Sequence, residues 1–377
     1  MDTATQHPPS AIQARLAPLL VGSVETLLAS WEPRLALFPF SSQLTVSGVR
    51  NVYANPIAVR YTINSLLGLA EAARSGSFGV SEDEVADLAQ SFLANERRIV
   101  LPADHALATM LRCAVGASAA SVESSVRTLR ALLQEPSALT MQDVGWTLWG
   151  ACVAAREGID GALDVAAAAL AFVRSRLVQP ETCLPLHTTA RYRRHLVSFG
   201  SLVYFLRAMH EAAITLGDAH AVRLFERGVD KALALQGPDG EWPWMLDNRT
   251  GTTVDPYPVF AVHQDSMAML FLHPAEDRGH VGSSEAIDRS LEWIFGANEL
   301  GRRMFSERPF FAYRSIERDE SFSRLRRYAR SVGPRRTTGE SWPLSARVRL
   351  NDECRSYHLG WLLYVWSGRV SATGLTA

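Results

Sequence analysis

The sequence is poor in lysine and cysteine. Lys231 is the only lysine among 38 basic residues, and the formal net charge of the 377-residue chain is −1. This charge argues against a general nucleic-acid-binding protein, because phosphate contacts need an excess of cations. The four cysteines are widely scattered and lack the paired spacing of a zinc site or a secreted disulfide framework. We therefore expect reduced, buried thiols.

Targeting and membrane signals are also lacking. The first ten residues have neither the basic nor the apolar region of a signal peptide. The alanine-rich run Leu163–Val173 is too short, and too closely flanked by charge, to span a bilayer. We expect a cytoplasmic protein without a transmembrane segment.

Common catalytic motifs are missing from the chain. It contains no HExxH, GxSxG, Walker A or GxGxxG pattern. It also lacks the DDxxD and NSE/DTE runs of class I terpene synthases and the paired ligands of LanC-like zinc enzymes. No cofactor is predicted from these patterns, and a divalent metal is left open.

What the chain does contain is a long series of amphipathic segments with apolar residues at three-to-four-residue spacing. The spacing predicts helices over residues 11–31, 56–74, 81–94, 103–115, 121–133, 141–156, 163–177, 188–216, 220–235, 264–272, 284–298, 322–331 and 355–366. Strand-like alternation is confined to short patches such as 43–49 and 346–350.

Short loops between these segments indicate pairs of helices packed as hairpins, which form an open solenoid or close into a ring. No strict repeat of fixed length is present, and such a repeat would have favoured an open array. We predict an all-α fold, an (α/α) toroid, as a single domain over residues 11–377 after a disordered tail at 1–10.

The stretch Gln236–Trp242 has the features of a helix end. Pro238 and Gly240 favour a turn, and Trp242 is placed to fold back against the helix. Its pattern Q-x-x-D-G-x-W resembles the QW motif of squalene-hopene and other class II terpene cyclases, which are α/α barrels. The DxDD acid of those cyclases is absent, so that activity would need Asp265 in its place.

The same region resembles a second group. Asp-Gly-Glu-Trp-Pro-Trp at 239–244, followed by Tyr257-Pro258 and His-Gln-Asp-Ser-Met at 263–267, is similar to segments lining the cleft of helical-toroid polysaccharide enzymes. Segments at 291–294, 298–301, 313–316 and 353–361 resemble helical proteins of bacterial exopolysaccharide pathways. The similarity to the polysaccharide enzymes, like that to the cyclases, implies a toroid fold.

Asp265 and His263 are the first candidates for chemistry. The functional interpretation is an acid/base pair at a helix start that faces a central cavity; the structural alternative is an N-terminal capping cluster. A helix dipole stabilises a nearby carboxylate as the anion, which suits a base. Trp244, Tyr257 and Gln264 are candidates for substrate contact, and Trp242 for either stacking or packing. Asp247 and Asp255 are further candidates that more often serve as turn residues.

A second group of candidates lies near the C-terminus. Glu353, Tyr357 and Trp361 recur every four residues and would share one helix face. Tyr357 and His358 are suited to proton transfer beside a substrate, and Trp342 to substrate contact. The alternative for Tyr357 is a buried core position with a polar tip.

An arginine-rich run separates the two groups. Residues 301–336 hold eleven arginines against four acidic residues, and Arg324, Arg327 and Arg330 recur at helical spacing. A solvated face is the usual explanation. The functional alternative is a site for uronate, sulfate or diphosphate, because the planar guanidinium binds such groups with two hydrogen bonds. Arg314, beside Tyr313, is the first candidate.

Our leading hypothesis is a carbohydrate-active enzyme, a hydrolase, lyase or epimerase, acting on a polysaccharide or glycoconjugate in a biosynthetic pathway. Asp265 and Glu353 would be its carboxylates, His263 and Tyr357 its proton-transfer groups, and Arg314 its anion clamp. The first alternative is an atypical terpene cyclase, taking an isoprenoid, in which Asp265 protonates an alkene. The second is a non-catalytic helical binding protein. No nucleic-acid partner is expected.

Overall fold

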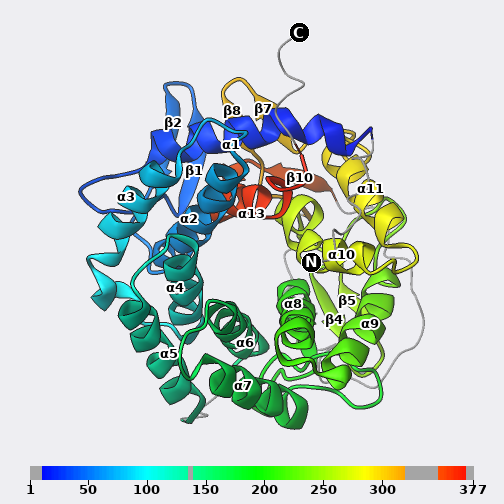
Figure 1. Cartoon of the computed structure of the whole chain (residues 1–377). Coiled ribbons are helices and arrows are strands. Elements are labelled where there is room, and N and C mark those ends of the chain that lie inside the picture. Colours follow the sequence, from blue (N-terminus) through cyan, green and yellow to red (C-terminus); the bar gives the residue numbers. More distant parts are fainter. Residues whose placement is uncertain (1–10, 135–138, 319–346, 371–377) are drawn as a thin grey trace.

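Twelve α-helices form a closed double ring in the computed structural model, which describes residues 11–134, 139–318 and 347–370 (Figure 1). The inner helices are α2 (Ala58–Ser75), α4 (Pro102–Ala114), α6 (Met141–Arg156), α8 (Phe199–Leu216), α10 (Met269–Asp277) and α13 (Ser356–Trp366). The outer helices are α1 (Ala17–Ser30), α3 (Glu82–Leu93), α5 (Ala119–Gln134), α7 (Ala162–Arg176), α9 (Ala219–Leu233) and α11 (Ser283–Ile294). The predicted all-α toroid is confirmed.

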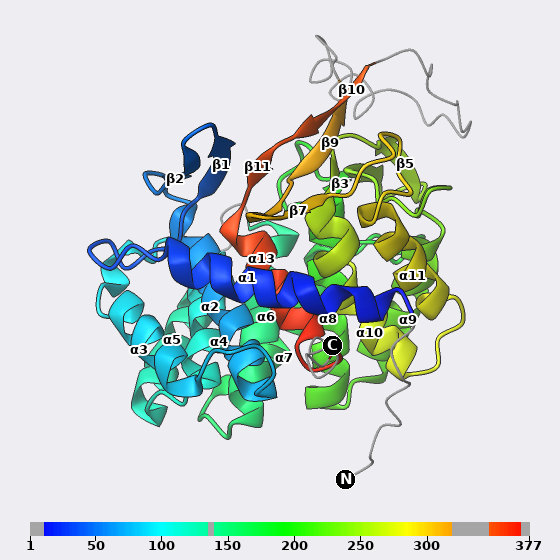
Figure 2. The ribbon, with the colours of Figure 1, turned by 90° about the horizontal axis from the view of Figure 1, so that it is seen from above.

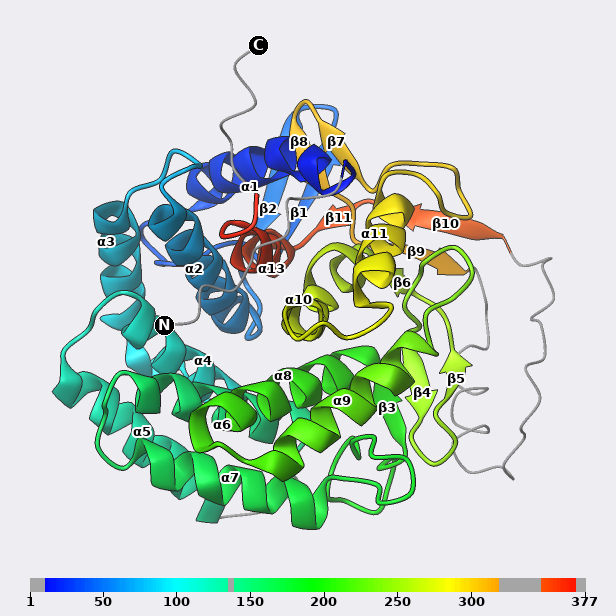
Figure 3. The same cartoon turned by 45° about the vertical axis from the view of Figure 1, so that its right-hand side comes forward.

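The ring closes because the last inner helix packs on the first. From α2 to α10 each inner helix contacts the next, and α13 contacts α2 and α1. The five-residue π-helix η3 (His263–Met267), which leads into α10, contacts both α10 and α13 and so closes the ring. Two short 3-10 helices, η1 (Gln13–Leu16) and η2 (Glu96–Arg98), complete the helical elements of the described residues. A turned view shows α13 enclosed by helices from both halves of the chain (Figure 3).

Glycine sets how closely these inner helices approach. A Cβ atom added at Gly68 of α2 would lie 2.0 Å from the carbonyl oxygen of Gly360 of α13. One added at Gly360 would lie 2.5 Å from the carbonyl oxygen of Asn64. The backbones of α2 and α13 are therefore in direct contact, and an alanine at either position would force them apart.

Short antiparallel strands gather on one side of the ring (Figure 2). They form the sheets β11-β1-β2, β10-β9-β6 and β3-β4-β5 and the hairpin β7-β8. Their bounds are β1 (Ser41–Thr45), β2 (Gly48–Val52), β3 (Leu196–Ser198), β4 (Met245–Asp247), β5 (Thr252–Asp255), β6 (Val259–Phe260), β7 (Phe305–Glu307), β8 (Phe310–Ala312), β9 (Ser315–Arg318), β10 (Val348–Asn351) and β11 (Glu353–Cys354).

These strands lead into the N-terminal ends of inner helices. The chain passes from β2 to α2, from β3 to α8, from β6 to η3 and from β11 to α13. We call this side of the ring the strand rim. Because an α-helix carries partial positive charge at its N-terminus, the strand rim receives that charge from several helices at once.

Most predicted helices are found within a few residues of their expected bounds, but two predictions were wrong in part. The helix expected from Thr188 begins only at Phe199, because the Ser198 hydroxyl caps it by accepting from the Ser201 N–H and the preceding residues join β3. The helix expected to end at Leu272 continues through Pro274 to Asp277.

Other expectations concern the strands and the membrane. The strand-like patches at 43–49 and 346–350 correspond to parts of β1, β2 and β10. The predicted helix 322–331 and the residues Arg324, Arg327 and Arg330 lie outside the described residues, as does the tail 1–10. Among the described residues, no helix is both long and apolar enough to cross a bilayer.

Candidate functional site at the strand rim

Asp265 lies in the π-helix η3 and is bonded to His358 of α13. The His358 Nε2 atom is 2.9 Å from Asp265 Oδ1 and 2.8 Å from Oδ2, and both side chains are buried. The Ser266 hydroxyl also donates to Asp265 Oδ1, at 2.6 Å. Single π-helical turns inserted before a helix are frequent at functional sites. From the sequence, His263 and Asp265 were expected to act as an acid/base pair; in the structure the hydrogen-bond partner of the Asp265 carboxylate is His358.

His263 instead lies among aromatic rings. It stacks on Trp244 with 16° between the ring planes and also contacts Phe199 and Phe260. Burial lowers the pKa of His263 to about 3, and the neighbouring His358 adds to the shift. Its Nδ1 atom is buried and has no hydrogen-bond partner among the described residues. His263 is therefore a neutral imidazole at physiological pH with one unused polar atom.

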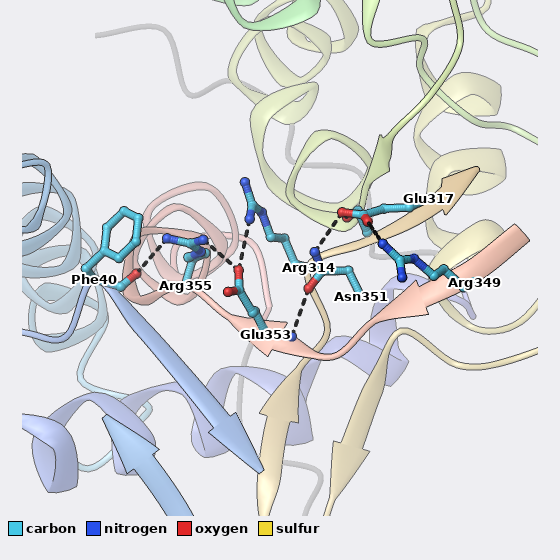
Figure 4. A network of polar contacts seen from close by, with 8 residues as sticks. Phe40, Arg314, Glu317, Arg349, Asn351, Glu353 and Arg355 are labelled. Atoms are coloured by element: carbon cyan, nitrogen blue, oxygen red, sulfur yellow. Dashed lines mark hydrogen bonds and ion pairs between the residues drawn. The ribbon is translucent and has the colours of Figure 1, made fainter. Parts of the chain in front are cut away.

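A charged network links Arg314, Glu353 and Arg355, the residue that precedes α13 (Figure 4). Glu353 of β11 accepts from Arg314 at 2.9 Å and from Arg355 at 2.6 Å, both through Oε2. Burial alone would raise the pKa of Glu353, but Arg355 and Arg314 outweigh burial and lower it. Glu353 therefore stays ionised and is unsuited to act as a general acid. It also precedes α13, so the prediction that it shares a helix face with Tyr357 and Trp361 was wrong.

Two tyrosines adjoin this network. The Tyr357 ring contacts Tyr61 of α2 with the ring centroids 4.3 Å apart, and Tyr61 stacks on Phe40 at 5.4 Å. Burial raises the pKa of Tyr357 and of Tyr61, although Arg355, Arg314 and Arg60 oppose the shift at Tyr61. Both hydroxyl groups stay protonated near neutral pH, so each can donate a hydrogen bond but cannot act as a base there.

A third cluster, the ion pair of Arg60 and Asp104, was not predicted. Arg60 Nε is 2.5 Å from Asp104 Oδ1, and the guanidinium lies over the Trp146 ring at 5.1 Å. Burial raises the pKa of Asp104, and Arg60 opposes the shift; the charge of Asp143, on the next inner helix, raises it further. A signal was present, because an arginine in the first turn of a helix opposes the helix dipole and so needs a partner.

We compared the whole chain with known proteins. No family model and no curated protein matches it. Solved structures do match: a sugar epimerase from a ruminal bacterium has 11% sequence identity and a TM-score of 0.63, with 92% of this chain and 96% of that chain covered. The cellobiose 2-epimerase of Bacillus thermoamylovorans has 11% identity and a TM-score of 0.62, covering 94% of this chain and 100% of the other.

A third similar structure is an unsaturated glucuronyl hydrolase specific for heparin, with 12% identity, a TM-score of 0.59 and coverage of 96% and 97% of the two chains. The similarity extends over nearly the full length in each case. The fold is that of the (α/α)-toroid carbohydrate enzymes. At these identities the likeness establishes the fold alone.

The QW-like segment is structural in this toroid. Gln236 Nε2 donates to the carbonyl oxygens of Gly240 and Ala286 and to the Ser290 hydroxyl, each at 3.0 Å. Trp242 is fully buried, and its Nε1 donates to the same hydroxyl at 2.9 Å. These bonds join the end of α9 to α11, as expected for a helix stop held by an aromatic residue.

Several predicted substrate contacts are occupied by other parts of the chain. Gln264 has no exposed surface; it accepts from the Trp242 N–H and donates to the Phe260 carbonyl. Asp247 pairs with Arg249 in the turn between β4 and β5. Asp255 accepts from the Tyr257 N–H, so both aspartates lie at the ends of strands and bond to residues two positions further on.

The remaining candidates differ in exposure. The Tyr257 hydroxyl donates to Glu299 at 2.6 Å, and Trp244 is partly exposed. Trp342 lies outside the described residues. No group of three or more His, Cys, Asp or Glu side chains in the described part of the chain is placed to hold a metal ion.

Proposed function

We propose that the chain is a carbohydrate-active enzyme with its active site at the strand rim, and that it transfers a proton to or from a carbon atom of a sugar. Epimerisation and elimination are the two reactions of this kind. The observation that carries the proposal is the buried contact between His358 Nε2 and both carboxylate oxygens of Asp265.

In this proposal Asp265 acts through His358. A carboxylate bonded to one imidazole nitrogen fixes the orientation and tautomer of the ring and stabilises the imidazolium that forms when the ring accepts a proton. Asp265 is then a positioning residue and His358 the base. His263, neutral and next to His358, provides a hydrogen-bond acceptor or donor for a hydroxyl group of the sugar.

The surroundings fit a sugar better than a carbocation. The rim presents the partly exposed Trp244 ring as a stacking surface and the protonated tyrosine Tyr61 as a hydrogen-bond donor. Arg60, Arg314 and Arg355 lie on the same side of the ring and would repel the cationic intermediates of a terpene cyclase. The isoprenoid alternative therefore has no support in the site.

The names of the similar structures support a sugar as the substrate. Two of them are named as sugar epimerases and one as a glucuronyl hydrolase, and each covers nearly the whole toroid. A biosynthetic pathway as the setting stays a prediction from the sequence.

Hydrolysis is the second candidate, and one observation favours it. A glycosidase needs a carboxylic acid with a raised pKa beside a second carboxylate. Burial raises the pKa of Asp104, and Asp143 is close enough to raise it further. The two residues occupy corresponding third positions of the consecutive inner helices α4 and α6.

The two candidates are separated by variants. Oligosaccharides would be incubated with the wild type, His358→Gln, Asp265→Asn and Asp104→Asn, and the products identified by chromatography and NMR. Proton transfer at carbon predicts an isomer or an unsaturated product that is lost in His358→Gln. Hydrolysis predicts shorter sugars with new reducing ends, and these products should be absent with Asp104→Asn.

A matched control is available in His280. Its Nε2 also contacts a carboxylate, that of Asp230 at 3.1 Å, but on the loop after α10 and not at the rim. His280→Gln should keep full activity. If the wild type converts no sugar, the proposal is wrong.

A further inference from the structure

We infer that the sugar bound at the strand rim carries a negatively charged group, a carboxylate or a sulfate, and that Arg314 binds this group. The inference rests on the proposed function for the presence of a sugar, and it adds the class of sugar.

The backbone of Arg314 is fixed from two sides. Its N–H donates to the Asn351 carbonyl at 3.1 Å, and its carbonyl accepts from the Ala261 N–H at 3.0 Å. It therefore joins the end of β10 to the segment between β6 and η3, two residues before His263. Because its backbone is held on both sides, the Arg314 side chain starts from a fixed position next to the proposed proton-transfer groups.

The guanidinium of Arg314 is only partly used. Among the described residues its hydrogen-bond partner is Glu353, reached through one nitrogen, while a guanidinium has five N–H donors. The side chain is 31% exposed. Figure 4 shows the other end of the group pointing away from Glu353 and from the rest of the network. Donors are therefore available for a second anion.

The positive charges around Arg314 also outnumber the negative ones, which favours binding of an anion. Glu353 is shared between Arg314 and Arg355, so two guanidinium groups face one carboxylate. Arg355 is buried over the Phe40 ring at 3.9 Å and donates to the Phe40 carbonyl, which keeps it in place. The nearby Glu317 does not neutralise the excess, because it pairs with Arg349 and accepts from Asn351. One positive charge remains.

Glu353 is then a positioning residue for Arg314. Its own N–H donates to the Asn351 side-chain oxygen at 3.1 Å, so its backbone is held by the same asparagine that binds Glu317. Its lowered pKa keeps it charged. The Phe260 ring lies under the Arg314 guanidinium at 5.5 Å and restricts it further.

Binding of three sugars of similar size tests the inference. Isothermal titration of the full chain would use glucuronate, glucose 6-sulfate and glucose at low and high salt. We expect at least one acidic sugar to bind about tenfold to hundredfold more tightly than glucose, the range of a charge-assisted hydrogen bond. Comparing the affinities of glucuronate and glucose 6-sulfate then shows whether the site prefers a planar carboxylate or a tetrahedral sulfate.

Variants assign the effect to Arg314. Arg314→Gln should remove the preference for the acidic sugar, and Arg303→Gln should not, because Arg303 is exposed and pairs with Glu307 away from Glu353. Glu353→Gln removes the charge that opposes the anion but keeps an acceptor for Arg314, so it should tighten binding of the acidic sugar at low salt and change the binding of glucose little. Equal binding of glucose and both acids, an unchanged preference in Arg314→Gln, or no saturable binding of either acid would overturn the inference.

The outcome is separable from that of the proposed function. The binding measurements can be repeated in His358→Gln, which should keep the preference for the acidic sugar. Charge-selective binding without any turnover contradicts the proposed function alone. Turnover of neutral sugars without a preference for acids contradicts this inference alone.

Discussion

Replacing Gly68 by alanine should destabilise the closed ring. The added Cβ would lie 2.0 Å from the Gly360 carbonyl oxygen and 2.7 Å from the Gly360 Cα, where about 3.4 Å is ordinary contact. Both obstacles are backbone atoms of α13, so no side chain can rotate away and the two helices must separate. Overpacking of this kind costs about 1–3 kcal/mol, and the clash is severe enough to place Gly68→Ala at the upper end.

The helix propensity of alanine offsets part of that cost. Alanine is favoured over glycine by about 1 kcal/mol in a helix interior. We therefore expect a net loss of about 2 kcal/mol, measured as a lower urea midpoint by circular dichroism.

Gly200→Ala in α8 is the matched control. The atom nearest to its added Cβ would be the flexible Met267 Cε at 3.3 Å, and the next two are also side-chain atoms, at 3.8 and 3.9 Å. The midpoint should therefore hold or rise slightly. An unchanged or higher midpoint in Gly68→Ala would refute the direct backbone contact between α2 and α13.

Three further predictions concern buried groups. The unfolded chain takes up a proton at His263 below about pH 6.5, whereas the folded chain does so only near its pKa of about 3. The free energy of unfolding therefore falls as the pH drops between these two values, by up to about 1.4 kcal/mol per pH unit. His263→Phe should lessen the shift in urea midpoint between pH 7 and pH 5. The fully buried Glu211 carboxylate pairs with Arg156 and Arg207, and Glu211→Gln leaves both arginines without this charge. The variant should lower the free energy of unfolding by about 3–5 kcal/mol. Asp164→Asn, in an exposed pair, is the control and should leave the urea midpoint nearly unchanged. Trp242→Phe removes the hydrogen bond to the Ser290 hydroxyl and should lower the free energy of unfolding by about 1–3 kcal/mol. An unchanged urea midpoint in this variant, even with a changed pH dependence of stability, would contradict the packing role of Trp242.

The fold was accessible from the sequence because it depends on local patterns. Apolar spacing of three to four residues fixed most helices, and the turn chemistry of Gln236–Trp242 predicted a helix end that the structure shows in detail. The short strands were largely missed, because each has only two to five residues and several pair with a segment distant in sequence, as β1 does with β11.

The site was less accessible, since it depends on which segments the closed ring brings together. Asp265 and His358 are 93 positions apart and meet only because α13 packs beside η3. The sequence favoured His263 as the partner because it is the nearest histidine in the chain. Arg314 and Glu353 were predicted individually, but as a clamp and a catalytic carboxylate, and their ion pair could not be predicted without the pairing of β9 and β10.

The central claim is that His358, held by Asp265, moves a proton at a carbon atom of a sugar. Incubation with oligosaccharides in D2O, followed by proton NMR of the sugar, tests it directly. The account predicts deuterium at one carbon position, or an unsaturated product, with the wild type and His280→Gln and neither of these with His358→Gln. Conversion of sugar without deuterium at carbon or an unsaturated product, or with equal rates in His358→Gln and the wild type, would contradict it.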